Sequence, residues 1–289
     1  MAAPATQGDG LATLPGWADH DPAPALAALA RQDDPLGRAA RLAPDARRFF
    51  ADRFVPGAPI AGHATGYYEP ELDGALAPSP GFRVPLHAMP AGGCTLPRAE
   101  VDRALGGQEI VWLRDAVDRF FLQVQGSGRI RLATGGTMRV GHSGRNGHPY
   151  RSIGKLLVAR GLLGADITAD RLKAWLRADA GRGLAVMDEN PSYVFFRALD
   201  VDPADGPPGT LGIPLTPFAS VAVDPEHCSL GRPIWIETEG FRGLCIAQDT
   251  GSAIVGPGRA DLFFGTGDRA GAAAGRLNHP ARVVPLVPG

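Results

Sequence analysis

Two patterns of apolar and polar positions divide this chain. Near the N-terminus the apolar residues follow a helical spacing: Ala25–Arg31 is rich in alanine, and Ala40–Phe54 carries Leu42, Phe49 and Phe50 at roughly helical intervals. After Pro56 the apolar runs become short and are separated by Gly and Pro, which is typical of strands and turns. The pattern predicts a helical beginning followed by a mainly β chain.

In the middle of the chain we expect strands and then helices. Three runs predict strands, namely Ile110–Leu113, Arg119–Val124 and Gly128–Leu132, and the turn-forming residues 125–127 separate the last two. Helical spacing returns over Ser152–Arg160 and Ala169–Ala178.

The C-terminal third contains six short apolar runs with glycine-rich turns and few intervening helices. Such a series predicts a small closed barrel. The runs are 193–196, 219–223, 233–236, 244–247, 262–264 and 282–286.

Composition narrows the possible functions. The 289 residues include 39 Gly and 27 Pro, which agrees with many turns. A net charge of −1 with 20% charged residues leaves no basic footprint for nucleic acid. No apolar run approaches the length of a transmembrane segment. The N-terminal residues 1–6 lack the features of a secretory signal, so the protein is either cytosolic or has lost a leader.

Neither a metal nor another cofactor is expected. The seven histidines are scattered, and the three cysteines, Cys94, Cys228 and Cys245, lack metal-ligand spacing. Cys228 and Cys245 could pair across neighbouring strands, but three free thiols are an equally good interpretation. The glycines at 265–271 do not have the spacing of a dinucleotide-binding loop.

Two aspartates stand out in a short glycine-rich span near the C-terminus. Asp261 directly precedes the apolar run Leu262–Phe264, and Asp249 precedes Thr250 and Gly251. Burying a carboxylate is costly unless the group is paired or used, so an acid in this setting is a candidate catalytic group. The alternative interpretation is that each aspartate caps a turn. Asp224, followed by Pro225, is more typical of a turn-starting residue.

Polar and aromatic residues elsewhere are candidates for binding a ligand. Tyr67 and Tyr68 are adjacent, so in a strand they point to opposite faces; one would pack in the core and the other would offer its ring face to a ligand. Thr65 and Gly66 lie on the same segment and offer hydrogen bonds.

A second candidate set follows from the predicted strand Arg119–Val124. Gln123 and Gln125 alternate with apolar residues and, with Ser127, would form a polar row suited to hydrogen-bonding a ligand. The alternative is a solvated strand face. A serine hydrolase is rejected, because Gly126-Ser127-Gly128 does not form a nucleophile elbow.

Four motifs, taken together and in order, resemble the membrane-bound lytic murein transglycosylases of the A type. The last of them resembles the 3D domain, named for three aspartates, which would be Asp224, Asp249 and Asp261 here. The motifs occupy residues 65–70, 121–128, 190–196 and 249–261, and the resemblance extends from about Gly62 to about Val287.

The resemblance implies a fold and a division into domains. It implies a mainly β protein: a double-psi β-barrel with an inserted second β-domain and a few peripheral α-helices. The barrel domain would comprise residues 1–70 and 190–289, and the insert residues 71–189. A glycan strand would lie in the groove between the domains. The candidate binding residues would contact its sugar, N-acetyl and hydroxyl groups, namely Thr65, Gly66, Tyr67, Tyr68, Gln123, Gln125 and Ser127.

The resemblance also implies an activity. Relatives cleave the β-1,4 bond between N-acetylmuramic acid and N-acetylglucosamine without water and leave a 1,6-anhydro sugar. Asp261 matches the catalytic acid, and Asp249 and Asp224 would support it. The implied partner is the peptidoglycan glycan strand, with other cell-wall enzymes possible. The implied location is the periplasm at the outer membrane, although a lipid-attachment cysteine is missing, since Cys94 lies far inside the sequence.

Two other functions remain compatible with the residues. A hydrolytic glycosidase on a similar barrel would use Asp249 or Asp224 as a second carboxyl and would release reducing ends. A non-catalytic wall-binding module would bind glycan and form no product.

Overall fold

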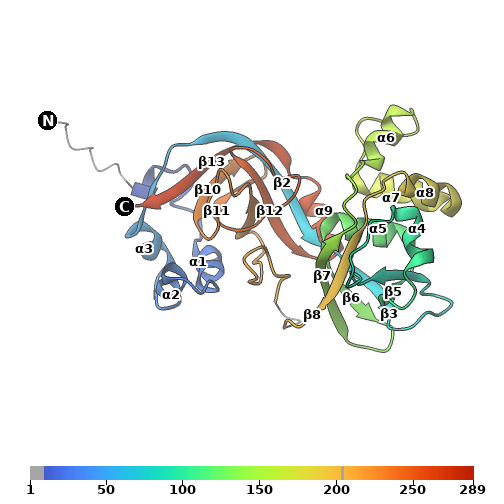
Figure 1. Ribbon diagram of the computed structural model, residues 1–289. Helices are drawn as coiled ribbons and strands as arrows, with labels where there is room; N and C mark the ends of the chain where they lie inside the picture. The colour runs from blue at the N-terminus through green and yellow to red at the C-terminus, as the bar shows by residue number, and fades with distance from the viewer. Residues whose placement is uncertain (1–9, 203–204) are drawn as a thin grey trace. The chain divides into compact units, whose positions relative to one another are not determined.

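A computed structural model describes residues 10–202 and 205–289, which form two units. Of the described residues, unit 1 takes 10–68, 205–265 and 269–289, and unit 2 takes 69–202 together with 266–268. Both units are built on β-sheet with peripheral helices, as Figure 1 shows. The mainly β character expected from the sequence is confirmed. None of the helices in the described ranges has the length and apolar character needed to cross a lipid bilayer.

Unit 1 is organised around a closed ring of six strands. Following hydrogen bonds around the ring, the order is β13-β10-β11-β9-β12-β2, and β2 pairs again with β13. The strands β9 and β11 run parallel, and β2, β10 and β13 pair antiparallel. A short β1 adds to β13 outside the ring. The strands are β1 (Phe54–Pro56), β2 (Ile60–Glu69), β9 (Ser220–Val223), β10 (Pro233–Thr238), β11 (Phe241–Asp249), β12 (Arg259–Thr266) and β13 (Asn278–Pro288).

Strand alternation separates the inside of the barrel from the outside. All six strands contribute to one apolar cluster, which includes Ala64, Val221, Ile234, Cys245 and Leu262. The opposite face of β10, β11 and β13 packs against the N-terminal helices, which Figure 1 shows grouped beside the barrel. The helical elements of unit 1 are η1 (Gly10–Thr13), α1 (Ala23–Ala30), α2 (Pro35–Arg41), α3 (Ala46–Ala51) and α9 (Asp268–Ala274).

Unit 2 contains a six-stranded sheet in the order β4-β5-β3-β6-β7-β8. One apolar cluster lies on this sheet, and a second joins the helices α5 to α8. Its elements are β3 (Glu71–Ala75), β4 (Val84–His87), α4 (Arg98–Ala104), β5 (Glu109–Leu113), α5 (Ala116–Gln125), β6 (Ser127–Leu132), β7 (Thr137–Arg145), α6 (Ile153–Ala159), α7 (Ala169–Ala178), α8 (Ala180–Asp188) and β8 (Val194–Leu199).

Three local predictions were wrong. The predicted helix 40–54 is two helices, because Pro44 interrupts it and Asp45 caps α3 by accepting a hydrogen bond from the Arg48 amide at 2.7 Å. The predicted strand 119–124 lies in the helix α5. The strand predicted at 193–196 forms β8, but it pairs with β7 in unit 2 and not with the barrel, where β2 is the sixth strand.

Gly62 marks a close approach of two barrel segments. A Cβ atom at Gly62 would lie 2.0 Å from the carbonyl oxygen of Gly258, whose φ is +67°. The Gly258 carbonyl also accepts a hydrogen bond from the His63 amide at 3.2 Å. The backbone of Gly258 therefore leaves no room for a side chain at Gly62.

We predict that Gly62→Ala lowers the free energy of unfolding by about 1–3 kcal/mol, the usual cost of overpacking. Chemical denaturation measures the change. Gly275→Ala is the matched control, because its Cβ would have its nearest neighbour at 3.4 Å. Equal effects of the two substitutions would contradict the close approach.

Candidate active site

Both C-terminal aspartates lie in one row across the barrel wall. Asp249 on β11 and Asp261 on β12 each pair in register with Ala222 of β9, the strand between them. Their neighbours Val221, Ala260 and Leu262 face the barrel interior, so this row lies on the outer face. A register shift between Ala247 and Asp249 redirects the end of β11. We call Asp249, Ala222 and Asp261 the aspartate row.

Strand β2 supplies a hydrogen-bond donor to each aspartate. The Thr65 hydroxyl donates to Oδ1 of Asp261 at 2.5 Å, and the Tyr67 hydroxyl donates to Oδ2 of Asp249 at 2.8 Å. Thr65 and Tyr67 are two residues apart, so they share a face of β2. The Tyr67 ring also packs on Phe263 at 5.3 Å between centroids. One side of β2 therefore carries contacts to both acids.

The other face of β2 packs against α9. A Cβ atom at Gly66 would lie 2.8 Å from Ala274 and 2.6 Å from Phe264. A Cβ atom at Gly271 would lie 2.7 Å from the Tyr68 ring, so this ring lies against α9. The opposite orientation of Tyr67 and Tyr68 agrees with strand alternation.

Burial governs the protonation of Asp261. The pKa of its carboxyl is raised by burial, lowered by the Thr65 hydrogen bond and the Arg259 charge, and raised by the Asp249 charge, with a net increase. The pKa of Tyr67 is also raised, because of burial and the neighbouring Asp249 and Asp261. Asp261 is therefore suited to carrying a proton at a higher pH than an ordinary aspartate.

Asp249 is held in place by a loop that the sequence did not identify. Its Oδ1 accepts hydrogen bonds from the backbone amide and hydroxyl of Thr210, both at 2.9 Å, and from the Thr250 amide at 2.9 Å. With Tyr67 on Oδ2, the carboxylate has several donors. Asp249 thus both fixes the turn into Thr250 and adds negative charge near Asp261.

Asp224 binds backbone amides. Its Oδ2 accepts from the Gly256 amide at 2.7 Å, and its Oδ1 from the Glu226 amide at 3.0 Å. These two hydrogen bonds lower the pKa of the carboxyl. The geometry supports the turn-starting role that the sequence favoured, because Asp224 holds the segment that leads into β12.

Gln123, Gln125 and Ser127 belong to unit 2 and do not form a strand face. Gln123 and Gln125 lie on α5, where a separation of two residues does not place side chains on one face. Gln123 is buried: its amide donates to the Val194 carbonyl at 3.0 Å, and its oxygen accepts from Arg98 at 2.6 Å. Its contacts hold unit 2 together.

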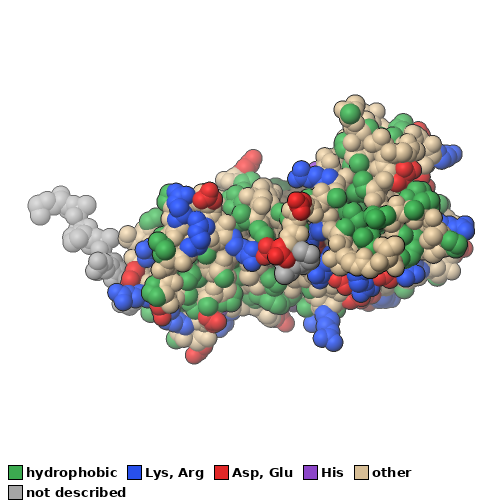
Figure 2. All heavy atoms as spheres, turned by 90° about the horizontal axis from the view of Figure 1, so that it is seen from below, with side chains coloured by type: hydrophobic (Ala, Val, Ile, Leu, Met, Phe, Trp, Pro, Cys, Tyr) green, Lys and Arg blue, Asp and Glu red, His purple; other side chains and the backbone are tan. Residues whose placement is uncertain are grey.

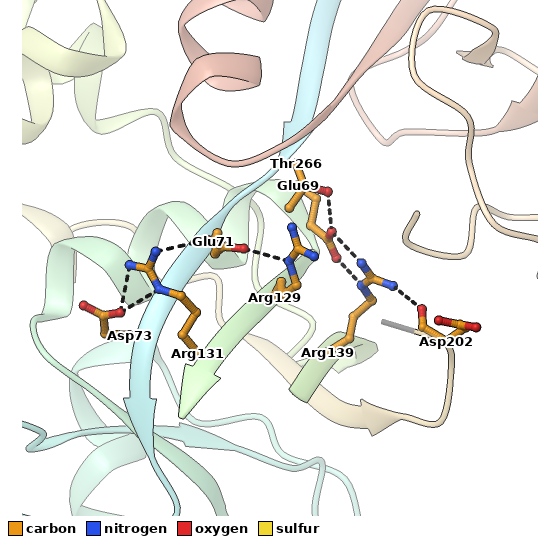
Figure 3. Close-up of polar contacts among 8 residues, drawn as sticks. All are labelled: Glu69, Glu71, Asp73, Arg129, Arg131, Arg139, Asp202 and Thr266. Atoms are coloured by element: carbon orange, nitrogen blue, oxygen red, sulfur yellow. Dashed lines mark hydrogen bonds and ion pairs between the residues drawn. The ribbon is translucent and has the colours of Figure 1, made fainter. Parts of the chain in front are cut away.

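Three arginines of unit 2 form ion pairs with carboxylates of the same unit. Figure 3 shows Arg129, Arg131 and Arg139 beside Glu71, Asp73 and Glu69. The nitrogen–oxygen distances in these ion pairs are 2.7–3.1 Å. On the face shown in Figure 2, Lys and Arg side chains are interspersed with Asp and Glu side chains.

The three cysteines are free, and the described part of the chain contains no candidate metal centre. Cys94, Cys228 and Cys245 are unpaired thiols, and burial raises the pKa of Cys228 to about 11. Across residues 10–202 and 205–289, His, Cys, Asp and Glu side chains form no group of three that could hold a metal ion.

Arg259 is the main site residue that the sequence analysis did not single out. It lies two residues before Asp261 on the same strand, and its guanidinium donates to the Thr65 hydroxyl oxygen at 2.8 Å. The apolar spacing of β12 gives no signal for this role, because the contact depends on the adjacency of β12 and β2.

Comparison with known proteins defines the class. The profile described as "MltA specific insert domain" matches residues 94–197, and the "3D domain" profile matches residues 219–287. The chain is therefore a 3D-domain protein with an MltA-type insert.

Solved and curated relatives extend the match. The lytic transglycosylase LtgG of Burkholderia pseudomallei is 42% identical with a TM-score of 0.72, covering 97% of this chain and 94% of that one. Escherichia coli MltA with bound chitohexaose is 28% identical with a TM-score of 0.75, covering 87% and 81%. The membrane-bound lytic murein transglycosylase A of Vibrio cholerae is 35% identical over 238 residues, 76% of this chain. The chain belongs to the family of membrane-bound lytic murein transglycosylase A. It spans 63% of the length of the Vibrio relative.

We predict that Gln123→Leu lowers the free energy of unfolding by about 1–3 kcal/mol, because it leaves the buried Arg98 guanidinium without one acceptor. Denaturant unfolding followed by circular dichroism measures the loss. Gln125→Leu, at the end of the same helix, is the control and should change stability by less than about 0.5 kcal/mol. Unchanged stability of Gln123→Leu with weakened glycan binding would restore the binding role expected from the sequence.

Proposed function

We propose that this protein is a peptidoglycan lytic transglycosylase with Asp261 as its acid and then its base. The observation that carries the proposal is a half-buried carboxyl with a raised pKa on the outer barrel face, which accepts a hydrogen bond from Thr65. Family membership supports the substrate class, as does the chitohexaose bound to the Escherichia coli relative. The substrate bond is the β-1,4 linkage between N-acetylmuramic acid and N-acetylglucosamine.

In the first step, neutral Asp261 donates its proton to the glycosidic oxygen. The bond between that oxygen and the anomeric carbon breaks, N-acetylglucosamine leaves with the proton, and positive charge develops on the muramyl ring. Because Oδ1 accepts the Thr65 hydrogen bond, the transferred proton is carried on Oδ2. The resulting Asp261 carboxylate stabilises the positive charge.

In the second step, the carboxylate takes the proton of the muramyl 6-hydroxyl. The 6-oxygen then bonds to the anomeric carbon, which closes the 1,6-anhydro ring and returns Asp261 to its neutral form. No water is consumed, so a single carboxyl serves both steps. Asp249 acts through its charge, and Asp224 supports the segment before β12.

We further propose that the six-stranded ring of unit 1 is a double-psi β-barrel and that unit 2 is the inserted domain. The parallel β9–β11 pair and the closure by β2 support the barrel assignment. The insert profile matches residues 94–197, which lie within unit 2, and this supports the assignment of unit 2 as the inserted domain. Tyr68, Gly66, Gln125 and Ser127 remain proposed glycan contacts.

We place the activity in the periplasm, in association with the outer membrane. Peptidoglycan is the substrate proposed here, and the curated relatives are named membrane-bound. Other cell-wall enzymes are the proposed protein partners.

We predict that Asp261→Asn abolishes turnover of purified peptidoglycan, because an amide cannot supply or take the proton. Mass spectrometry of released fragments should detect 1,6-anhydro-N-acetylmuramic acid ends from the unsubstituted protein only. Glycan binding and the thermal unfolding midpoint should be retained. Reducing-end fragments, one water heavier, would indicate a hydrolase, and binding without any product would indicate a wall-binding module.

We predict that Asp249→Asn shifts the loss of activity at high pH to lower pH. Removing the negative charge lowers the pKa of Asp261, so the proton is lost from the acid at lower pH. The amide oxygen can still accept the hydrogen bonds from Thr210 and Thr250. The shift is tested by measuring initial rates across pH. An unchanged high-pH limb of the rate profile would mean that Asp249 does not influence the pKa of Asp261.

A further inference from the structure

Arg259 shares a strand face with Asp261 and reaches the neighbouring strand. Its guanidinium donates to the Thr65 hydroxyl oxygen at 2.8 Å, to the Ala260 carbonyl at 2.8 Å and to the His63 carbonyl at 3.3 Å. The acceptors belong to β12 and to β2. A planar guanidinium held by acceptors on two strands has a fixed orientation.

The chemistry of the three groups gives the hydrogen bonds a direction. A guanidinium can only donate, so Arg259 occupies a lone pair of the Thr65 oxygen. A threonine hydroxyl has a single hydrogen, and the 2.5 Å contact shows that it points to Oδ1 of Asp261. Arg259 therefore donates a hydrogen bond to Thr65, and Thr65 donates one to Asp261.

We propose that Arg259 is a positioning residue for Asp261: it orients the Thr65 hydroxyl so that Oδ1 is occupied and Oδ2 is left to exchange the proton. This inference rests on the proposed function of Asp261. Neither Arg259 nor its contact with Thr65 could be assigned from the apolar pattern of β12.

The charges around the carboxyl support this role. Asp249 on β11 opposes ionisation of Asp261, whereas Arg259 on β12 and the Thr65 hydroxyl favour it. Tyr67 on β2 is the other titratable neighbour, and its pKa is raised. Arg259 thus limits how far burial raises the pKa of Asp261, which keeps the carboxylate accessible as the base of the second step.

The test compares Arg259→Gln, Arg259→Lys, Thr65→Val and the double variant Arg259→Gln/Thr65→Val. Two measurements are made: kcat and KM for anhydro-product release across pH, and the Asp261 titration by carboxyl NMR without substrate, assigned with Asp261→Asn. Arg242→Gln, an exposed arginine on β11 of the same unit, is the control.

We expect Arg259→Gln to lower kcat about tenfold at unchanged KM, roughly the effect of one lost hydrogen bond. The high-pH limb and the NMR titration should both move to higher pH, because a charge that favours the carboxylate is gone. Arg259→Lys should leave the high-pH limb and the Asp261 titration where they are in the unsubstituted protein, because the positive charge is kept. It should still lower kcat, because lysine lacks the planar fork of donors that a guanidinium provides. The double variant should be no slower than Thr65→Val alone.

Specific results would overturn the inference. Multiplicative losses in the double variant would show that Arg259 acts independently of Thr65. An unmoved Asp261 titration in Arg259→Gln, or equal effects of Arg242→Gln, would remove the role altogether. If the unsubstituted protein releases no anhydro product, the proposed function fails, but the NMR titration still tests whether Arg259 acts on Asp261. If Arg259→Gln does not fold, Arg259→Lys tests the role through kcat alone, and an undiminished kcat in that variant would overturn it.

Discussion

Strand β2 closes the barrel of unit 1, because it is hydrogen-bonded to β13 along one edge and to β12 along the other. The same strand delivers Thr65 to Asp261 and Tyr67 to Asp249. A closed barrel has no free edge, so the backbone that carries these hydroxyls cannot shift without breaking the ladder. The geometry around Asp261 is therefore a consequence of barrel closure, and the absence of a side chain at Gly62 is part of what lets β2 approach.

Local sequence patterns predicted the strands and helices whose apolar residues follow a regular spacing. The barrel strands β9 to β13 carry apolar runs that were recognisable one by one, and α6 and α7 have helical spacing. The helix α5 was missed because its buried face includes Arg119 and Gln123 beside apolar residues, which mimics alternation. The cues for a helix were present: Asp115 caps its start, and Gly126 ends it in the left-handed conformation.

Contacts between distant segments were beyond local patterns. Asp261 could be recognised as unusual from its apolar surroundings, but the partners that define its chemistry come from elsewhere. Thr65 precedes Asp261 by 196 positions, and Thr210 precedes Asp249 by 39. These contacts depend on strand order and register, which a single sequence does not encode in any short window. Family resemblance supplied Asp261, and the structure adds Arg259 and Thr210.

Ala222 is an apolar residue with an electrostatic consequence. It occupies the middle of the aspartate row, two strand spacings of about 4.8 Å separate the backbones on its two sides, and its methyl group is the only side chain between the acids in that row. A small residue there leaves each carboxyl within the field of the other. The pKa of Asp261 thus depends partly on the size of a side chain that cannot ionise, and evolution could adjust that pKa without touching a polar residue.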